Sequence, residues 1–255
     1  MAKPAKSDRQ AKIDKIRKQQ KGAEKRRGYA IVGVCAAIGL AMVGAAAYNP
    51  IRTSLAADGL SDEPLAEIGA AADVCGEITT EPTNDNNNHV DENTQIQYET
   101  APPAFGPHWN VFGLAPVPLD RQFYTENDRP ELEQLIHNLE HGFTILWYDQ
   151  TVADDAGQIA EVRAIARKFS GNDANRRNAF IAAPWTSEDA GGAEFPDGQH
   201  VALTHWSGGG VGQESDTSKH VGVWQYCSAP SGEALESFME QYPVTDSPEP
   251  NAAMG

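Results

Sequence analysis

Sulfur-containing residues are scarce in this chain, which has three cysteines and four methionines in 255 residues. No Cys-x-x-Cys pattern occurs, so thioredoxin-type redox activity is not supported. Met239 is the only methionine after residue 48 apart from Met254, which argues against a methionine-rich copper(I) site. The chain also lacks a Gly-x-Ser-x-Gly turn and a phosphate-binding loop, the sequence signatures of other common enzyme classes.

Basic residues are sparse after residue 27, and those before it form a segment of their own. The first 27 residues contain eleven lysines and arginines against three acids, a net charge of +8. Because the whole chain carries −16, residues 28–255 carry −24. Such an acidic region repels nucleic acid, so we expect no nucleic-acid partner.

An uncharged apolar stretch follows the basic segment, from Tyr29 to Tyr48. It is long enough to span a bilayer, and a tyrosine at each end suits the membrane interface. The alternative is a secretory signal cleaved near Ala45-Ala46-Ala47, but the stretch is longer than the apolar part of such signals, which favours an uncleaved anchor. The positive-inside rule then places the basic tail in the cytoplasm and the rest of the chain outside.

These features predict a single-pass membrane protein with a basic cytoplasmic tail at residues 1–28 and a transmembrane helix at 29–48. The expected continuation is a linker at 49–74, one extracytoplasmic domain at 75–245 and a flexible tail at 246–255. Membrane lipid should bind the anchor and the basic tail. A protein complex of the cell envelope is a further candidate partner.

Two of the cysteines, Cys75 and Cys227, lie in the part predicted to be exported, whereas Cys35 lies in the membrane span. Disulfides persist outside the cytoplasm, and an even pair there predicts a bond between Cys75 and Cys227. Such a bond would close a very long loop and tie the entry of the domain to its C-terminal part.

Strand and helix patterns alternate along the exported part. The predicted strands are residues 94–99, 143–148, 179–183 and 200–206, and the predicted helices are the segment before Gly142, 159–169 and 232–242. An acidic, glycine-rich loop is expected at 185–199. This order predicts an α+β fold, with a mainly antiparallel sheet packed by helices in a single exported domain.

The segment His137-Asn138-Leu139-Glu140-His141-Gly142 has the most distinctive chemistry. A helix is predicted here because Asp128 can cap it, Pro130 suits its first turn and Gly142 suits its end. The apolar residues recur at the spacing of a core stripe, at Leu132, Leu135, Ile136 and Leu139. His137 and His141 point away from that stripe. They are either a shared metal site or two exposed residues at a helix C-terminus, where positive charge is favourable.

A metal site would need further ligands from other segments. The proline-rich arm Ala101–Trp109 is stiff enough to hold His108 in place without a helix or strand. Imidazole-rich sites suit copper(II) and zinc, which are the expected ions. The predicted ligands are His108, His137, His141 and His205, with His89 or an acid as alternatives for the fourth position. Glu133 and Glu140 are expected to accept hydrogen bonds from the ring nitrogens that face away from the metal.

Three other functions compete with metal binding. His-x-x-Glu-His is the pattern of one class of zinc hydrolases, but that class is larger and needs a distant acidic ligand, so we assign no catalytic residue and lean against an enzyme. A non-catalytic accessory or assembly subunit of an envelope complex would use these histidines structurally. A cleft lined by Trp109, Trp147 and Trp206 is explained more simply as core.

Several motifs together resemble a bacterial family called domain of unknown function 3105. They are Pro102-Pro103 followed by Gly106-Pro107-His108, then His137-x-Leu139-Glu140-His141-Gly142, then an aromatic strand ending in Trp147-Tyr148, and later Thr204-x-Trp206. The resemblance runs over roughly Cys75–Glu249 and implies a membrane-anchored exported domain, often of actinobacteria, without indicating a reaction, because the family has no known activity. Ala104-Phe105 and His205-Trp206-Ser207 depart from the usual residues of the family.

Overall fold

The computed structural model describes residues 4–110, 114–170, 178–186, 188–189, 194–251 and 253–254. It divides into two compact units, Met1–Ile51 and Arg52–Gly255, and each is described by itself. The first unit consists of the greater part of helix α1, which runs Pro4–Gly59. Within Arg9–Gly44 this helix is long and apolar enough to cross a membrane, by length and composition.

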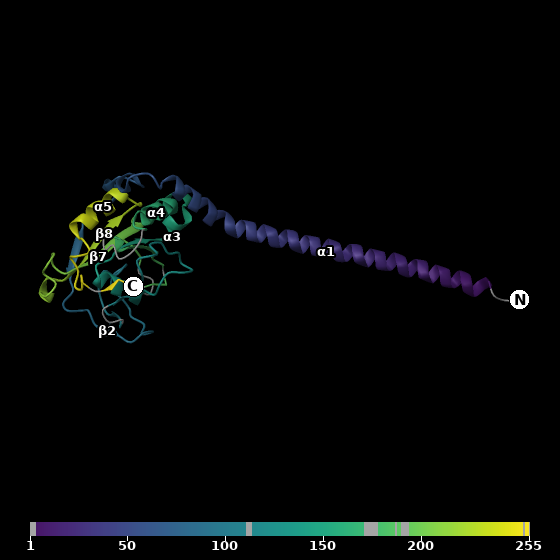
Figure 1. The fold of residues 1–255 in the computed structure, drawn as a ribbon, viewed down its shortest axis with the longest axis horizontal. Coiled ribbons are helices and arrows are strands. Elements are labelled where there is room, and N and C mark those ends of the chain that lie inside the picture. The colour runs from purple at the N-terminus through teal and green to yellow at the C-terminus, as the bar shows by residue number, and fades with distance from the viewer. Residues whose placement is uncertain are drawn as a thin grey trace. The chain divides into compact units, whose positions relative to one another are not determined.

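The second unit is α+β (Figure 1). Its helices are α2 (Leu132–Glu140), α3 (Gln150–Asp154), α4 (Ala156–Lys168) and α5 (Gly232–Gln241), with 3-10 turns η1 (Leu65–Glu67), η2 (Ala72–Val74) and η4 (Thr217–Lys219). Its strands are β1 (Thr79–Pro82), β2 (His89–Val90), β3 (His108–Trp109), β4 (Leu114–Ala115), β5 (Thr144–Tyr148), β6 (Phe180–Pro184), β7 (Val201–Ser207), β8 (Val221–Cys227) and β9 (Ala253–Met254).

Five strands form the central sheet in the order β1-β8-β7-β5-β6. The pairs β1–β8, β8–β7 and β7–β5 are antiparallel, and only β5–β6 is parallel. The parallel pair is connected through α3 and α4, as expected because parallel neighbours need a crossover. The mainly antiparallel sheet predicted from the sequence is therefore confirmed.

The sheet separates two cores, because successive side chains of a strand point to opposite faces. On β5, Leu146 and Tyr148 join the core formed with α4 and α5. Ile145 and Trp147 join the other core, which receives the leucine stripe of α2. Helices therefore cover both faces, and α2 lies on the face opposite α4 and α5.

Helix α2 begins and ends for local reasons. Glu131 is its N-cap and forms a reciprocal capping box with Gln134, so the prediction that Asp128 caps the helix is wrong. Asp128 instead accepts hydrogen bonds from the backbone and hydroxyl of Thr125, at 2.6 and 2.8 Å. The helix ends at Glu140, and Gly142 follows its C-cap with φ +91°, where an added Cβ would lie 2.2 Å from the Val244 carbonyl oxygen.

Most of the helices and strands predicted from the sequence are present, with ends that differ by a few residues. The strands predicted at 143–148, 179–183 and 200–206 are β5, β6 and β7, and the helices at 159–169 and 232–242 are α4 and α5. Residues 94–99 do not form a strand, and β1 and β8 were not predicted. Residues 187 and 190–193 of the predicted acidic loop lie outside the described residues.

The segments flanking the domain pack more closely than predicted. Ala57 and Ile68, in the predicted linker, are fully buried in the core beneath α4 and α5. Asp246 and Ser247, in the predicted flexible tail, are 4% and 1% exposed, and β9 pairs with β4. The compact unit therefore extends beyond the predicted limits of 75–245 at both ends.

Cys75 and Cys227 form the predicted disulfide, which links positions 152 residues apart. Cys75 lies beside the last residue of β8, so the bond ties the segment that precedes β1 to the sheet. The chain-entropy model attributes several kcal/mol to such a long closed loop.

Candidate functional site

The second face of α2 carries the two histidines, and it is buried rather than exposed. His137 and His141 have no solvent-exposed surface, and Glu140 between them is 2% exposed. The leucine stripe of α2 packs on the sheet, while its other side contacts β3. The alternative of two exposed histidines at a helix terminus is therefore wrong.

Strands β2 and β3 bring two more histidines to this side of α2. The two strands pair in parallel with His89 opposite His108, so both side chains lie on the same side of the pair. Backbone hydrogen bonds hold the register, from His108 N to the Asn88 carbonyl at 3.0 Å and from Asn110 N to the Val90 carbonyl at 2.7 Å. The rings of His89 and His108 lie 4.5 Å apart, measured between centroids.

The proline-rich arm that precedes His108 is fixed by side chains from elsewhere in the domain. Proline has no backbone N–H, so the arm offers mainly carbonyl oxygens. The Trp224 indole donates to the Pro102 carbonyl, and the Tyr226 hydroxyl donates to the Ala101 carbonyl, both at 2.8 Å. The Tyr98 hydroxyl donates to the Pro107 carbonyl at the same distance. Three anchors therefore restrict where His108 can lie.

Four side chains converge where these elements meet, and together they are called the histidine cluster. Its members are His89, His108, His137 and Glu140, each of which offers one ligand atom within 4.8 Å of the others. Glu140 Oε2 lies 3.1 Å from His108 Nε2, 3.3 Å from His89 Nε2 and 3.9 Å from His137 Nε2. Bonds of about 2.0–2.2 Å to one tetrahedral ion would place its ligand atoms about 3.3–3.6 Å apart. The three distances from Glu140 extend to either side of this range, so the four atoms are close enough to hold one ion through three nitrogens and one oxygen.

The orientation of His108 makes the contact with Glu140 informative. His108 Nδ1 lies 2.8 Å from the Gly106 carbonyl oxygen, which can only accept, so Nδ1 carries a proton. In the neutral ring Nε2 then has a lone pair directed at the Glu140 carboxylate, which also has lone pairs. Either a proton or a cation must lie between these two atoms.

Burial makes the helix histidines neutral ligands at ordinary pH. Desolvation, followed by the nearby His108, lowers the pKa of His137 to about 2, with the Trp109 carbonyl opposing this slightly. Desolvation also lowers the pKa of His141 to about 4, although the charge of Glu140 partly opposes it. The Trp109 carbonyl lies near His137 but outside hydrogen-bonding geometry, and no ring nitrogen of His137 or His141 has a hydrogen-bond partner among the described residues. Buried nitrogens without partners are costly unless something coordinates them.

His137 and His141 do not belong to the same group of ligand atoms. Their rings are 4.7 Å apart, but His141 groups with Glu140 and Glu249, while His137 groups with His89 and His108. Helical spacing predicted that both histidines share one ion, as the hydrolase pattern also requires. The geometry instead gives Glu140 the position of a ligand common to both groups.

His205 and Glu133 lie apart from both groups, contrary to the roles predicted for them. His205 has its Nε2 2.6 Å from the Asp246 carbonyl and its Nδ1 3.2 Å from the Phe143 carbonyl. The reason is that successive side chains of a strand face opposite sides of the sheet. The Trp206 ring lies 5.9 Å from the His108 ring, measured between centroids, so the neighbouring His205 faces the other side of β7. Glu133 accepts a hydrogen bond from Ile96 N at 3.1 Å.

His89 was predicted only as an alternative ligand, and Glu249 was not predicted. His89 lies in an asparagine-rich loop without helix or strand pattern, and only its pairing with β3 places it. Glu249 follows the last helix by eight residues, and its backbone N–H donates to the Glu140 carbonyl at 2.9 Å. Burial and then the charge of Glu140 raise the pKa of Glu249. No local pattern in the sequence indicates this contact.

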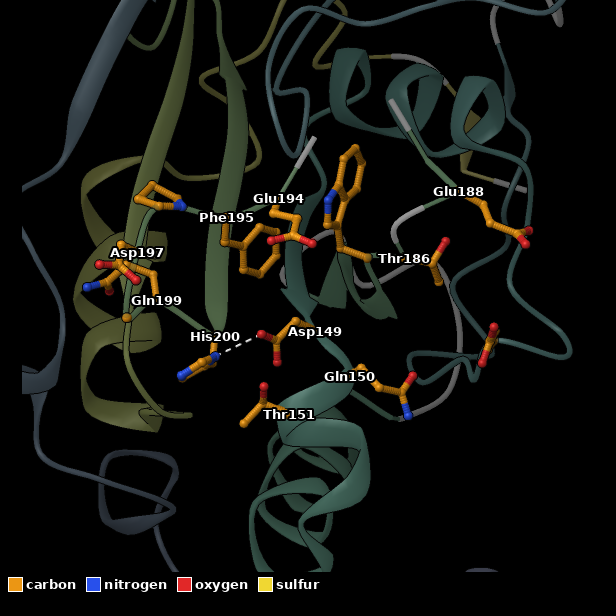
Figure 2. Close-up of a pocket in the computed structure, with 14 residues that line it drawn as sticks. Asp149, Gln150, Thr151, Thr186, Glu188, Glu194, Phe195, Asp197, Gln199 and His200 are labelled. Atoms are coloured by element: carbon orange, nitrogen blue, oxygen red, sulfur yellow. Dashed lines mark hydrogen bonds and ion pairs between the residues drawn. The ribbon is translucent and has the colours of Figure 1, made fainter. Parts of the chain in front are cut away.

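A second feature of the domain is an open pocket of about 540 Å³ that also contains a histidine and acids. His200 Nδ1 lies 2.8 Å from Asp149 Oδ2, and Figure 2 shows these two side chains facing each other. Three further acids, Glu188, Glu194 and Asp197, are spread around the pocket rather than directed at one point (Figure 2). This pocket therefore offers an acidic surface but no set of convergent ligands.

Comparison with known proteins identifies a family but no activity. Residues 89–254 match the model of the family described as "Protein of unknown function (DUF3105)". The match begins at His89 and contains every member of the histidine cluster and Glu249. A search of curated proteins gave no match, and neither did a search of solved structures.

Proposed function

The chain belongs to this family of unknown function, and we propose that its second unit binds one zinc or copper(II) ion through the histidine cluster. The observation that carries the proposal is the convergence of three imidazole Nε2 atoms on one buried carboxylate oxygen, at 3.1, 3.3 and 3.9 Å. A divalent ion among these atoms would satisfy all four.

The donor set favours zinc or copper(II) over other divalent ions. Three imidazoles with one carboxylate suit these metals, whereas magnesium and calcium prefer oxygen ligands throughout. Both cysteines of the second unit are in the disulfide, so no thiolate is available to it. The hydrogen bond from His108 Nδ1 to the Gly106 carbonyl would fix the tautomer in which Nε2 coordinates.

The same geometry gives less support to the zinc hydrolase. That mechanism uses the glutamate of His-x-x-Glu-His as a general base and both histidines as ligands of one ion. Here Glu140 lies among the ligand atoms, and His137 and His141 belong to different groups. A metal-binding module that does not itself catalyse hydrolysis accounts for these positions better.

The metal site is tested by titrating the full-length protein, purified in detergent, with zinc and with copper(II) against a competing chelator. We expect His137→Ala to weaken the first binding step more than about 100-fold, since even outer partners of metal ligands contribute 10–100-fold. His200→Ala is the matched control, because this histidine also has a carboxylate partner but lies in the open pocket. Failure of the wild-type protein to bind either ion at micromolar concentration would contradict the proposal and favour an accessory subunit with structural histidines.

We further propose that helix α1 anchors this unit outside the membrane, with the basic tail in the cytoplasm. The support is the apolar stretch within Arg9–Gly44 and the net charge of +8 that precedes it. A reporter that works only in the cytoplasm, fused after Gly255, should be inactive, and activity would reverse the orientation. Anionic lipid is then the expected partner of the tail, and an envelope protein complex a partner of the exported unit.

A further inference from the structure

His141 and Glu249 form a second concentration of ligand atoms beside the histidine cluster. Glu140, His141 and Glu249 each offer one ligand atom, and these atoms lie within 4.8 Å of one another. His141 is fully buried, and neither of its ring nitrogens has a hydrogen-bond partner among the described residues. The single ion proposed above would be bound by His89, His108, His137 and Glu140, and it would leave His141 unsatisfied.

The position of Glu249 is built into the fold rather than left to a loose terminus. Its backbone N–H donates to the Glu140 carbonyl at 2.9 Å. Three residues earlier, the Asp246 carboxylate accepts hydrogen bonds from the Ser207 hydroxyl at 3.0 and 2.9 Å and from Gly210 N at 2.8 Å. These bonds hold the C-terminal segment against the end of α2, so the Glu249 side chain is half-buried beside Glu140 and His141.

Two carboxylates so close together in a largely buried place repel each other. The ligand oxygens of Glu140 and Glu249 lie within 4.8 Å of each other, and the described residues place no lysine or arginine in this group. Like charges at this separation are costly when water is largely excluded. A cation bound by both carboxylates and by a ring nitrogen of His141 removes the repulsion and satisfies the orphaned imidazole.

We infer that Glu140 bridges two divalent metal ions, the second of which is held by Glu140, His141 and Glu249. The inference rests on the proposed function for the first ion and extends it to a dinuclear centre, in which ions are typically about 3.5–4 Å apart. The second ion has one nitrogen and two carboxylate ligands from the chain, fewer than the four to six positions that these metals fill. An oxygen donor from solution, either water or a small oxyanion, completes its coordination.

The experiment compares metal stoichiometry and affinity in the full-length protein, purified in detergent and stripped with a chelator. Zinc content is measured by elemental analysis after desalting, and the two binding steps are resolved by competition titration. Wild type is expected to bind two zinc ions per chain. Glu249→Gln and His141→Asn are each expected to bind one zinc ion. The affinity of the first binding step should change by less than about 10-fold in these variants, because loss of a partner of a metal ligand typically costs 10–100-fold. Glu188→Gln, an exposed glutamate of the open pocket, is the matched control and should bind two.

Copper(II) provides a readout that a structural role of Glu249 would not change. Two copper(II) ions bridged by one carboxylate couple magnetically, so spin quantitation of the wild type at saturation should fall short of its copper content. In Glu249→Gln the single remaining ion should give a full, uncoupled signal. Near-ultraviolet circular dichroism of each variant verifies that the domain is folded.

The outcomes separate the second site from the first. One ion per chain in the wild type, unchanged in Glu249→Gln and His141→Asn, overturns the dinuclear centre and leaves the mononuclear proposal standing, with Glu249 as a charge partner only. If the wild type and both variants bind two ions, His141 and Glu249 are not ligands of the second ion. Absence of any bound ion in the wild type overturns both proposals.

Discussion

His108 lies 3.1 Å from Glu140 and His200 lies 2.8 Å from Asp149, yet the two pairs have different surroundings. His108 has no exposed surface and shares its carboxylate with His89 and His137. The His200 side chain is 34% exposed, and its pair lies in the wall of the open pocket. The second unit therefore contains one crowded and one isolated histidine–carboxylate pair.

The two pairs differ in how the ring nitrogens of the histidines find hydrogen-bond partners. An isolated, solvent-accessible pair is satisfied by one hydrogen bond and by water, and it contributes little to stability. In the histidine cluster, several imidazole nitrogens compete for one carboxylate oxygen where water is largely excluded, so protons alone satisfy them poorly. Burial and the number of converging groups, not residue type, distinguish a candidate metal site from a surface pair.

The largest effect is expected from removing the disulfide. This bond ends beside the isolated pair, where the His200 N–H donates to the Cys227 carbonyl at 2.9 Å. Cys75→Ser should lower the free energy of unfolding by about 2–5 kcal/mol, because the unfolded chain loses a long covalent loop. Chemical denaturation of the oxidised wild type and the variant measures this. The zinc affinity of the proposed site should be the same in the variant and the wild type under native conditions. Loss of metal from a variant that remains folded would show that the cluster depends on this bond.

Acidification of the metal-free protein should have the next largest effect, counted for each buried histidine. The pKa values of His137 and His141 are lowered by burial to about 2 and about 4. Below pH 6.5 the unfolded chain therefore binds protons that the folded chain does not, and stability falls as pH falls. At pH 5 each residue should cost about 2 kcal/mol relative to neutral pH.

Urea denaturation at pH 7 and pH 5 measures this acid effect. His141→Asn should lose about 2 kcal/mol less than the wild type between these two pH values, because its share of the proton uptake is removed. His200→Ala serves as the control from the open pocket. An acid effect of the same size in His141→Asn and the wild type would contradict the burial argument.

The smallest effect compares two glycines with positive φ, one in each region. Gly106 has φ +143° and its carbonyl orients His108, whereas Gly198 has φ +74° and lies in the wall of the open pocket. Gly106→Ala should destabilise by about 1–3 kcal/mol, since the backbone is strained and the added Cβ would lie 3.0 Å from the Tyr98 ring.

Gly198→Ala has only the backbone strain, because no atom lies within 4 Å of its added Cβ, so it should cost about 1 kcal/mol. Metal affinity provides the sharper contrast. Gly106→Ala should weaken binding about 10–100-fold by disturbing the support of His108, and Gly198→Ala should leave it unchanged. Equal affinities in the two variants would show that the Gly106 carbonyl does not position a ligand.

Local patterns predicted the elements that a single periodicity encodes. The apolar spacing of Leu132, Leu135 and Leu139 predicted α2, and the run Phe143–Tyr148 predicted β5. Strand β8 was missed because Gly222 interrupts its apolar alternation. That glycine is explained only by tertiary packing, since an added Cβ there would lie 2.3 Å from the Phe105 ring.

The candidate site was predictable where a stiff local segment carries the residue. Helical spacing indicated that His137 and His141 leave the leucine stripe, and the proline-rich arm indicated that His108 could be held near them. His205 was misplaced because a strand residue faces one side or the other depending on register, which the sequence analysis did not resolve for β7.

The sequence by itself determined the apolar segment within α1, the helix that carries His137 and Glu140, and the cysteine pair, because each depends on composition or on residues close together in the chain. Only the tertiary structure decided that His89 lies beside His108, that Glu140 is common to both groups, and that Glu249 reaches the end of α2. These contacts join segments that lie up to 109 positions apart, the separation of Glu140 and Glu249. They arise from strand pairing and burial, which require the folded core to exist before the side chains can meet.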